Sequence, residues 1–338
     1  MSFNSLNNYF FFNSLLQMSF NNFLNNRKRP DIEELALSGA CHRGIMYIGA
    51  FHYLEEIKLL NRKNLKRVVG TSIGSFILAC YISGYTIYDL IKIVLDIQFE
   101  VFKDWSSQGF NFINLFEGYV FRTWAIKCLS KYLPVNITME EFYKKTGIEF
   151  TITTVSLDTG LVYISHKTRP NMILHDAVIA SMNVPFVFPP YITSDGLLKD
   201  IYVDGGILDN FPIHLLGLRA FGLVPIRSKI SLSEINNPFS YFIKMTELVN
   251  SMIGDLRSSK SKYIIEICDT SSDFIDFDLS KDDKITMYKL GYNSVKNSKI
   301  VDQFIMDFYK QSFKDVLDQL IYESLLKKDM QNFSSKLI

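Results

Sequence analysis

The sequence predicts an α/β fold in which helices cover both faces of a mainly parallel sheet, a three-layer α/β/α sandwich. Short apolar runs typical of buried strands alternate with helical patterns through the first two-thirds of the chain. Turns that contain glycine separate several of these strands from the helices that follow. The 338 residues, 48% hydrophobic and 21% charged, suffice for a large core that needs neither disulfides nor metals.

Strand and helix patterns follow one another along the chain. Apolar, β-prone runs predict strands at residues 34–38, 65–69, 150–156, 161–165 and 263–268. Apolar residues at helical spacing predict helices at residues 44–60, 73–81, 86–102, 175–182, 239–256, 285–295 and 301–326. The T-x-x-E pattern at residues 138–141 is a capping box that opens one more short helix. This alternation favours parallel strands with helices packed on the sheet.

Charge and cysteine usage narrow the classes of partner and cofactor. Thirty-six Lys and Arg against 35 Asp and Glu leave a net charge of +1, so no strong field holds a polyanion, and nucleic acid is not expected as a partner. The cysteines, Cys41, Cys80, Cys128 and Cys268, form no C-x-x-C pair and have no histidine at metal-ligand spacing. We therefore expect reduced thiols in a cytoplasmic compartment, and no metal.

Two uncharged stretches are candidates for targeting or membrane segments. Residues 1–26 lack the basic start and the unbroken apolar run of a secretory signal. Their apolar residues recur at helical spacing and precede a basic cluster at 27–29, which fits either an interfacial membrane helix or a helix docked on its own domain. Residues 68–88 are long enough to span a bilayer, but their glycines and hydroxyl residues favour a buried strand, turn and helix. No transmembrane span is expected.

The first chemical motif is a G-x-S-x-G at residues 70–74, between an apolar strand and an apolar helix. A nucleophile elbow needs this setting, because small residues at Gly70 and Gly74 let a strained turn project the hydroxyl of Ser72 at the helix N-terminus. The alternative is a tight strand-to-helix turn with no catalytic role.

Two further loops carry candidate chemistry. Residues 38–44 (SGACHRG) join a predicted strand to a predicted helix, and their amides could face an anion, although the pattern is not a P-loop. In residues 202–212, Asp204 ends a strand and Gly205 and Gly206 let the chain turn away sharply, which leaves the carboxylate at the sheet edge. Taken singly, the first loop is equally compatible with an ordinary glycine-bounded turn, and an isolated D-G-G favours a structural aspartate that caps the following turn.

Together these motifs resemble the patatin-like phospholipase family, whose order is a glycine-rich oxyanion loop with an arginine, then G-x-S-x-G, then D-G-G or D-G-A. Residues 180–190 (ASMNVPFVFPP) also resemble the family signature A-S-x-x-x-P-x-x-F-P-P and precede the D-G-G as that order requires. The resemblance divides the chain into an N-terminal extension (1–32), a patatin-like catalytic core (33–227) and a C-terminal region (228–338) expected to pack on the same core.

The resemblance implies an acyl hydrolase of the phospholipase A type that works without a cofactor. Ser72 would be the nucleophile and Asp204 the general base of a Ser–Asp dyad, and water would later clear the acyl-enzyme. The implied substrate is a phospholipid or another lipid ester, met at a membrane surface. The implied location is cytoplasmic and peripheral to membranes.

The oxyanion loop implied by the resemblance runs from Gly39 to Gly44. The amides of Ala40 and Cys41 would hold the oxyanion, and Arg43 would either fix the loop or meet a phosphate head group. The family loop usually reads G-G-G-x-R-G, whereas this chain reads G-A-C-H-R-G. If either middle position needs a positive φ, its side chain costs on the order of 1 kcal/mol.

Two rival functions remain open at this stage. The first rival is a Ser-His-Asp carboxylesterase, in which the acid precedes the histidine in the chain. Asp204 with His214 fits this order best, and His175 is the other candidate histidine. The altered oxyanion loop favours the second rival, a lipid-binding or scaffolding relative without turnover. The aromatic stretch at 105–124 fits either a lid that contacts lipid or ordinary core packing.

Overall fold

In a computed structural model of the chain, the described residues are 30–105, 114–194, 199–227, 235, 238–256, 261–269 and 276–334. Asp31–Ser298 forms one compact unit. Outside this unit the structure describes α10 (Lys299–Ser334), which belongs to a second unit. The segment expected to form an N-terminal amphipathic helix lies outside the described residues, and the domain boundaries at 32 and 227 stay predictions.

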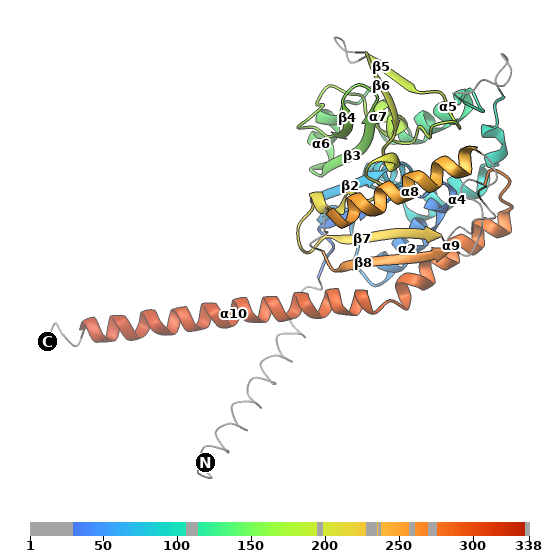
Figure 1. The fold of residues 1–338 in the computed structure, drawn as a ribbon. Helices are drawn as coiled ribbons and strands as arrows, with labels where there is room; N and C mark the ends of the chain where they lie inside the picture. Colours follow the sequence, from blue (N-terminus) through green and yellow to red (C-terminus); the bar gives the residue numbers. More distant parts are fainter. Residues whose placement is uncertain are drawn as a thin grey trace. The chain divides into compact units, whose positions relative to one another are not determined.

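Within the described residues, the strands of the compact unit form one eight-stranded sheet (Figure 1). The strands are β1 (Glu34–Leu37), β2 (Arg67–Thr71), β3 (Glu149–Ser156), β4 (Gly160–Ile164), β5 (Tyr191–Ser194), β6 (Lys199–Asp204), β7 (Phe221–Arg227) and β8 (Tyr263–Asp269). Their order is β5-β6-β3-β2-β1-β7-β8, and β4 pairs with β3. Strands β3, β2, β1, β7 and β8 run parallel, while β4, β5 and β6 join antiparallel.

Helices lie on both sides of this sheet, so the predicted three-layer α/β fold is confirmed. The helices of the compact unit are α2 (Ile45–Glu56), α3 (Ile73–Ser83), α4 (Ile87–Asp96), α5 (Tyr119–Leu129), α6 (Met139–Thr146), α7 (Leu174–Ser181), α8 (Pro238–Leu256) and α9 (Lys281–Lys296). The predicted capping box opens α6, where Thr138 and Glu141 bond each other's backbone amides.

Helices α2 and α9 approach each other closely because each has a glycine at the crossing. A side chain at Gly49 would collide with the backbone of Tyr288, and one at Gly291 would collide with the backbone of Met46. This contact packs α9, which lies after residue 227, against the first helix of the parallel core.

The register of the central strands brings the candidate motifs together. Strands β1 and β2 pair so that Leu37 lies opposite Gly70, near the carboxyl end of each strand. Strand β6 pairs with β3, which itself pairs with β2, so that Asp204 lies opposite Thr154. Because carboxyl ends of parallel strands meet at one edge of a sheet, the loops after β1 and β2 emerge side by side.

The sequence prediction differs from the structure at several elements, and helix α5 was not predicted. The single helix predicted over 86–102 is wrong, because α4 ends at Asp96 and a separate 3₁₀ turn covers Phe99–Phe102. The buried amine of Lys284 on α9 bonds the carbonyl of Ile97 and satisfies the end of α4 there. Strands β5 and β7 were not predicted; β7 contains Gly222 and Pro225, which obscure a strand pattern.

Candidate active site

Ser72 lies between β2 and α3 with φ +52° and ψ −129°, a backbone conformation that residues other than glycine rarely adopt. Gly70 and Gly74 are required because other parts of the backbone lie where their side chains would be. A Cβ on Gly74 would lie 2.6 Å from the carbonyl oxygen of Ser38, and one on Gly70 would lie 2.8 Å from the amide nitrogen of Ser75. The local geometry is that of a strained turn that projects a hydroxyl between a strand and a helix.

The hydroxyl of Ser72 donates a hydrogen bond directly to Asp204, with 2.6 Å between Oγ and Oδ2. The other carboxylate oxygen accepts the amide of Gly206 at 2.7 Å. Both side chains are buried. Burial raises the pKa of Asp204 to about 6, although the bonds from Ser72 and Gly206 oppose this shift. The carboxylate is therefore mostly ionised at neutral pH and can take a proton from the serine.

Ser181 holds the backbone of Ser72 in place. Its hydroxyl accepts the amide of Ser72 at 2.7 Å and donates to the carbonyl of Thr153 at 2.6 Å. The amide of Ser72 is thus engaged and does not face an incoming oxyanion in this geometry. Sequence reasoning missed this role, although Ser181 belongs to the A-S-x-x-x-P signature.

The loop after β1 lies against the elbow. A Cβ on Gly39 would lie 3.2 Å from Cβ of Ser72, so Gly39 allows this close approach. Cys41 has φ +48°, whereas Ala40 has φ −154°, which lies outside the left-handed region that favours glycine. Of the two departures from the family pattern, Cys41 therefore occupies the backbone conformation that favours glycine.

Arg43 and Gly44 complete this loop. The guanidinium of Arg43 donates from Nε to Oδ2 of Asp269 at 2.8 Å, and the two side chains are only 5% and 7% exposed. This buried pair ties the loop to the end of β8, which fits the loop-fixing role expected for Arg43 and not a head-group contact. Gly44 is needed because a side chain there would collide with Ile73.

Neither candidate histidine lies between the serine and the aspartate. His214 is 3.7 Å from Asp209 and 3.3 Å from the hydroxyl of Tyr163, which itself donates to Asp209. His175 contacts Asp176 through Nδ1 at 3.0 Å. Since Ser72 bonds Asp204 directly, this arrangement does not contain the relay of a Ser-His-Asp triad.

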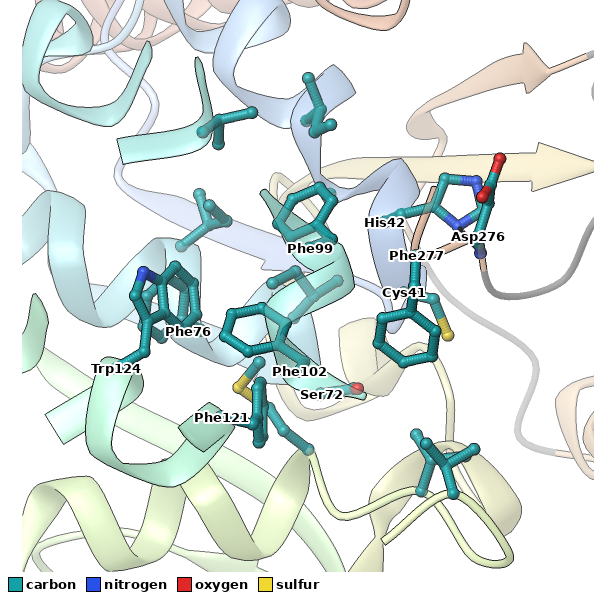
Figure 2. Close-up of a pocket in the computed structure, with 18 of the residues that line it drawn as sticks. Cys41, His42, Ser72, Phe76, Phe99, Phe102, Phe121, Trp124, Asp276 and Phe277 are labelled. Atoms are coloured by element: carbon teal, nitrogen blue, oxygen red, sulfur yellow. Dashed lines mark hydrogen bonds between the residues drawn. The ribbon is translucent and has the colours of Figure 1, made fainter. Parts of the chain in front are cut away.

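Ser72 is part of the lining of an apolar cavity (Figure 2). Its polar lining comes from Cys41, His42, Ser72 and Asp276. The rest of its wall is mainly aliphatic and aromatic, with side chains that include Phe76, Ile77, Leu90, Ile93, Val94, Phe99, Phe102, Phe121, Trp124, Met182, Val187, Phe188 and Phe277. The site therefore combines a buried nucleophile with a compartment suited to an apolar chain.

The aromatic stretch at 105–124 contributes to this wall. Phe121 and Trp124 of α5 line the cavity, Phe116 is buried, and Trp105 is exposed. These contacts make the described part of the stretch both core and cavity wall. Residues 106–113, which belong to the predicted lid, lie outside the described residues.

His42 lines the cavity as a neutral imidazole. Its Nδ1 accepts the backbone amide of Asp276 at 3.1 Å, and burial together with the charge of Arg43 lowers its pKa to about 3. In the parts of the chain that the structure describes, no cluster of three or more His, Cys, Asp or Glu side chains could hold a metal ion. None of the described helices is both long and apolar enough to cross a bilayer.

Comparisons with known proteins agree with this architecture. Residues 35–216 match the family described as patatin-like phospholipase. The chain is 28% identical to the probable lipid hydrolase 463L of Invertebrate iridescent virus 6, over 54% of this chain and 62% of that protein. It is 28% identical to triacylglycerol lipase 5 of Saccharomyces cerevisiae, over 54% of this chain and 27% of that protein. VipD from Legionella pneumophila has a similar fold, with a TM-score of 0.56 at 15% identity over 81% of this chain and 67% of that chain.

The mostly parallel sheet with helices on both sides is an α/β fold, and VipD has a similar one. More than half of the chain matches one family, and the chain belongs to the patatin-like phospholipase family. The lipid hydrolase and lipase among its relatives support a hydrolase. The chain spans less than two-thirds of the length of either of these relatives.

Proposed function

We propose that this chain is a lipid acyl hydrolase of the phospholipase A type, which cleaves a carboxylic ester through Ser72 and Asp204 without a cofactor. The observation that carries the proposal is the 2.6 Å hydrogen bond from the Ser72 hydroxyl to the Asp204 carboxylate, where Ser72 lines an apolar cavity. A serine bonded to a buried base is the arrangement that nucleophilic acyl transfer needs.

The reaction follows from this geometry in two halves. Oγ of Ser72 attacks the ester carbonyl carbon while its proton passes to Asp204, and the amides of Ala40 and Cys41 stabilise the oxyanion. The C–O bond to the alcohol then breaks, and Asp204 returns the proton to the leaving oxygen. Water attacks the acyl-enzyme with Asp204 again as the base, which releases the fatty acid and restores Ser72.

The cavity supports an acyl chain as the group transferred. Its wall beyond Ser72 is almost entirely aliphatic and aromatic, so a fatty acyl chain buries apolar surface there while a charged head group stays outside. The phospholipid or other lipid ester thus enters acyl chain first. The lipase and lipid hydrolase among the relatives support the same substrate class.

A surface of α8 supports action at a membrane. Tyr241, Met245, Leu248 and Met252 recur at helical spacing, and each is between 44% and 69% exposed. An exposed apolar stripe of this kind suits the boundary of a lipid layer. All four cysteines lie in described ranges and form no disulfide there, which supports a reducing, cytoplasmic location. The exposed stripe on α8 supports a place peripheral to membranes.

Covalent labelling with a fluorophosphonate tests the proposal. The probe should modify Ser72 in the wild-type protein, and Ser72→Ala should abolish the label. The same two proteins are then assayed for fatty acid released from phosphatidylcholine vesicles. Labelling with release that depends on Ser72 is the expected result. Vesicle binding without labelling or release would replace the hydrolase with the lipid-binding, scaffolding relative.

A further inference from the structure

Helix α8 carries one amide side chain that reaches the loop after Asp204. Nδ2 of Asn250 donates to the carbonyl of Gly206 at 2.6 Å and to that of Ile207 at 3.3 Å. Its Oδ1 accepts the backbone amide of Asn210 at 3.0 Å. One side chain on α8 therefore binds the Gly206–Asn210 segment at both of its ends.

The bond to Gly206 acts next to the catalytic carboxylate. Gly206 donates its amide to Oδ1 of Asp204 at 2.7 Å, while its carbonyl accepts from Asn250. The amide and the carbonyl of Gly206 are thus each held by a hydrogen bond, one to Asp204 and the other from Asn250. A glycine has wide conformational freedom, so a partner on the carbonyl side helps to keep the amide aimed at the carboxylate.

The bond to Asn210 extends the same network to the oxyanion loop. The carbonyl of Asn210 accepts the amide of Gly39 at 3.1 Å, and its Nδ2 donates to the carbonyl of Gly39 at 3.1 Å. Gly39 precedes Ala40 and Cys41, the proposed oxyanion donors. A continuous chain of hydrogen bonds therefore runs from Asn250 through Asn210 to the start of the oxyanion loop.

We propose that Asn250 is a positioning residue that holds the Asp204 loop and the oxyanion loop in the spacing that acyl transfer requires. This inference rests on the proposed hydrolase function. Asn250 is not among the residues that line the cavity, so it acts on the reacting groups and not on the acyl chain. Its removal affects kcat more than KM.

The test compares Asn250→Ala and Asn250→Asp with Ser251→Ala, an exposed neighbour on the same helix. Both Asn250 variants lose the donor to Gly206, and the aspartate variant keeps an acceptor for Asn210. We expect both to lower kcat by about 10- to 100-fold with KM within about twofold of wild type. Without Asn250, the bond from the Gly206 amide to Asp204 should weaken, and the pKa of Asp204 should rise. The acidic limb of the pH profile should therefore move upward by roughly half a pH unit or more. It should move further in Asn250→Asp, because the negative charge of the new aspartate also raises the pKa of Asp204. Ser251→Ala should match wild type.

Three outcomes separate this inference from the function on which it rests. If the wild-type protein neither labels with fluorophosphonate nor hydrolyses vesicles, the proposed function fails and the inference fails with it. If the wild type is active and both Asn250 variants keep kcat within about twofold, the inference alone is overturned. A lower melting temperature with kcat and the acidic limb unchanged would also overturn it, because Asn250 would then serve only stability.

Discussion

Two loops at the same edge of the sheet show how backbone strain is used in this molecule. Each follows one of two neighbouring parallel strands, β1 and β2, and each leads into a helix. Each also holds a residue other than glycine at positive φ, with Cys41 at +48° and Ser72 at +52°. The two loops therefore share their local strain and differ in what the strained side chain does.

At the elbow, the strained residue is the one whose side chain is needed. The hydroxyl of Ser72 points to Asp204, and Ser181 bonds its amide. In the oxyanion loop the backbone is needed instead, because an amide and not the thiol of Cys41 would hold the oxyanion. Under the proposed mechanism the side chain of Ser72 is therefore indispensable, while the loop needs no side chain at Cys41.

The largest expected effect lies on the elbow side. Ser72→Ala and Asp204→Asn should each lower kcat by roughly 10⁴-fold or more, because the nucleophile and its base act as one unit. Thermal unfolding should show both variants folded. His214→Ala and His175→Ala serve as matched controls and should keep most of the activity. A comparable loss in either histidine variant would contradict the dyad and restore the triad.

The second largest expected effect on activity concerns Cys41 in the oxyanion loop. Cys41 is half-buried and lines the cavity together with Ser72, so an added carbamidomethyl group should obstruct the ester carbonyl. Iodoacetamide should lower activity by about 10²- to 10³-fold, the range for a displaced oxyanion donor. Mass spectrometry is needed to assign the effect, because the exposed Cys268 will also react. Full modification of Cys41 with unchanged turnover would remove its side chain from the site.

A smaller effect concerns the charge of the base. Asp204 accepts a proton only when ionised, and burial raises its pKa to about 6. Activity should therefore be highest above pH 6 and fall about tenfold per pH unit below it. A profile of kcat/KM between pH 4.5 and 8 measures this limb. A midpoint near 4, the value of an exposed aspartate, would contradict a buried base.

Much of this arrangement could be predicted from the sequence because it depends on local patterns. The G-x-S-x-G at 70–74 lies between an apolar strand and an apolar helix, and the structure has a strained turn there. The order of the motifs predicted that loops distant in sequence would meet. The parallel register of β1 with β2 brings two of those loops to one edge.

The remaining parts depend on contacts between distant segments, for which the sequence carries no local signal. Arg43 pairs with Asp269, 226 residues further along the chain. Asn250 is one polar residue in an amphipathic helix. Its bonds to Gly206 and Asn210 form only when α8 packs against the loop after Asp204. The break after Asp96 likewise depends on Lys284, which reaches the end of α4 from α9.

The smallest expected effect compares the two departures from the family loop. Cys41→Gly relieves a positive φ that costs a side chain about 1 kcal/mol, but it adds about 0.5–1 kcal/mol of backbone entropy to the unfolded chain. The free energy of unfolding should stay within about 1 kcal/mol of wild type, activity should be kept or raised, and sensitivity to alkylation should disappear. Urea unfolding and the vesicle assay measure these quantities.

Ala40→Gly is the matched control for Cys41→Gly. Ala40 has φ −154°, so a glycine there relieves no positive φ and adds entropy to the unfolded chain. Ala40→Gly should therefore destabilise the protein by about 0.5–1 kcal/mol, and the Cys41→Gly protein should be the more stable of the two variants. Equal destabilisation by both substitutions would mean that the positive φ of Cys41 stores no strain, and that the two loops are less alike than their backbone angles indicate.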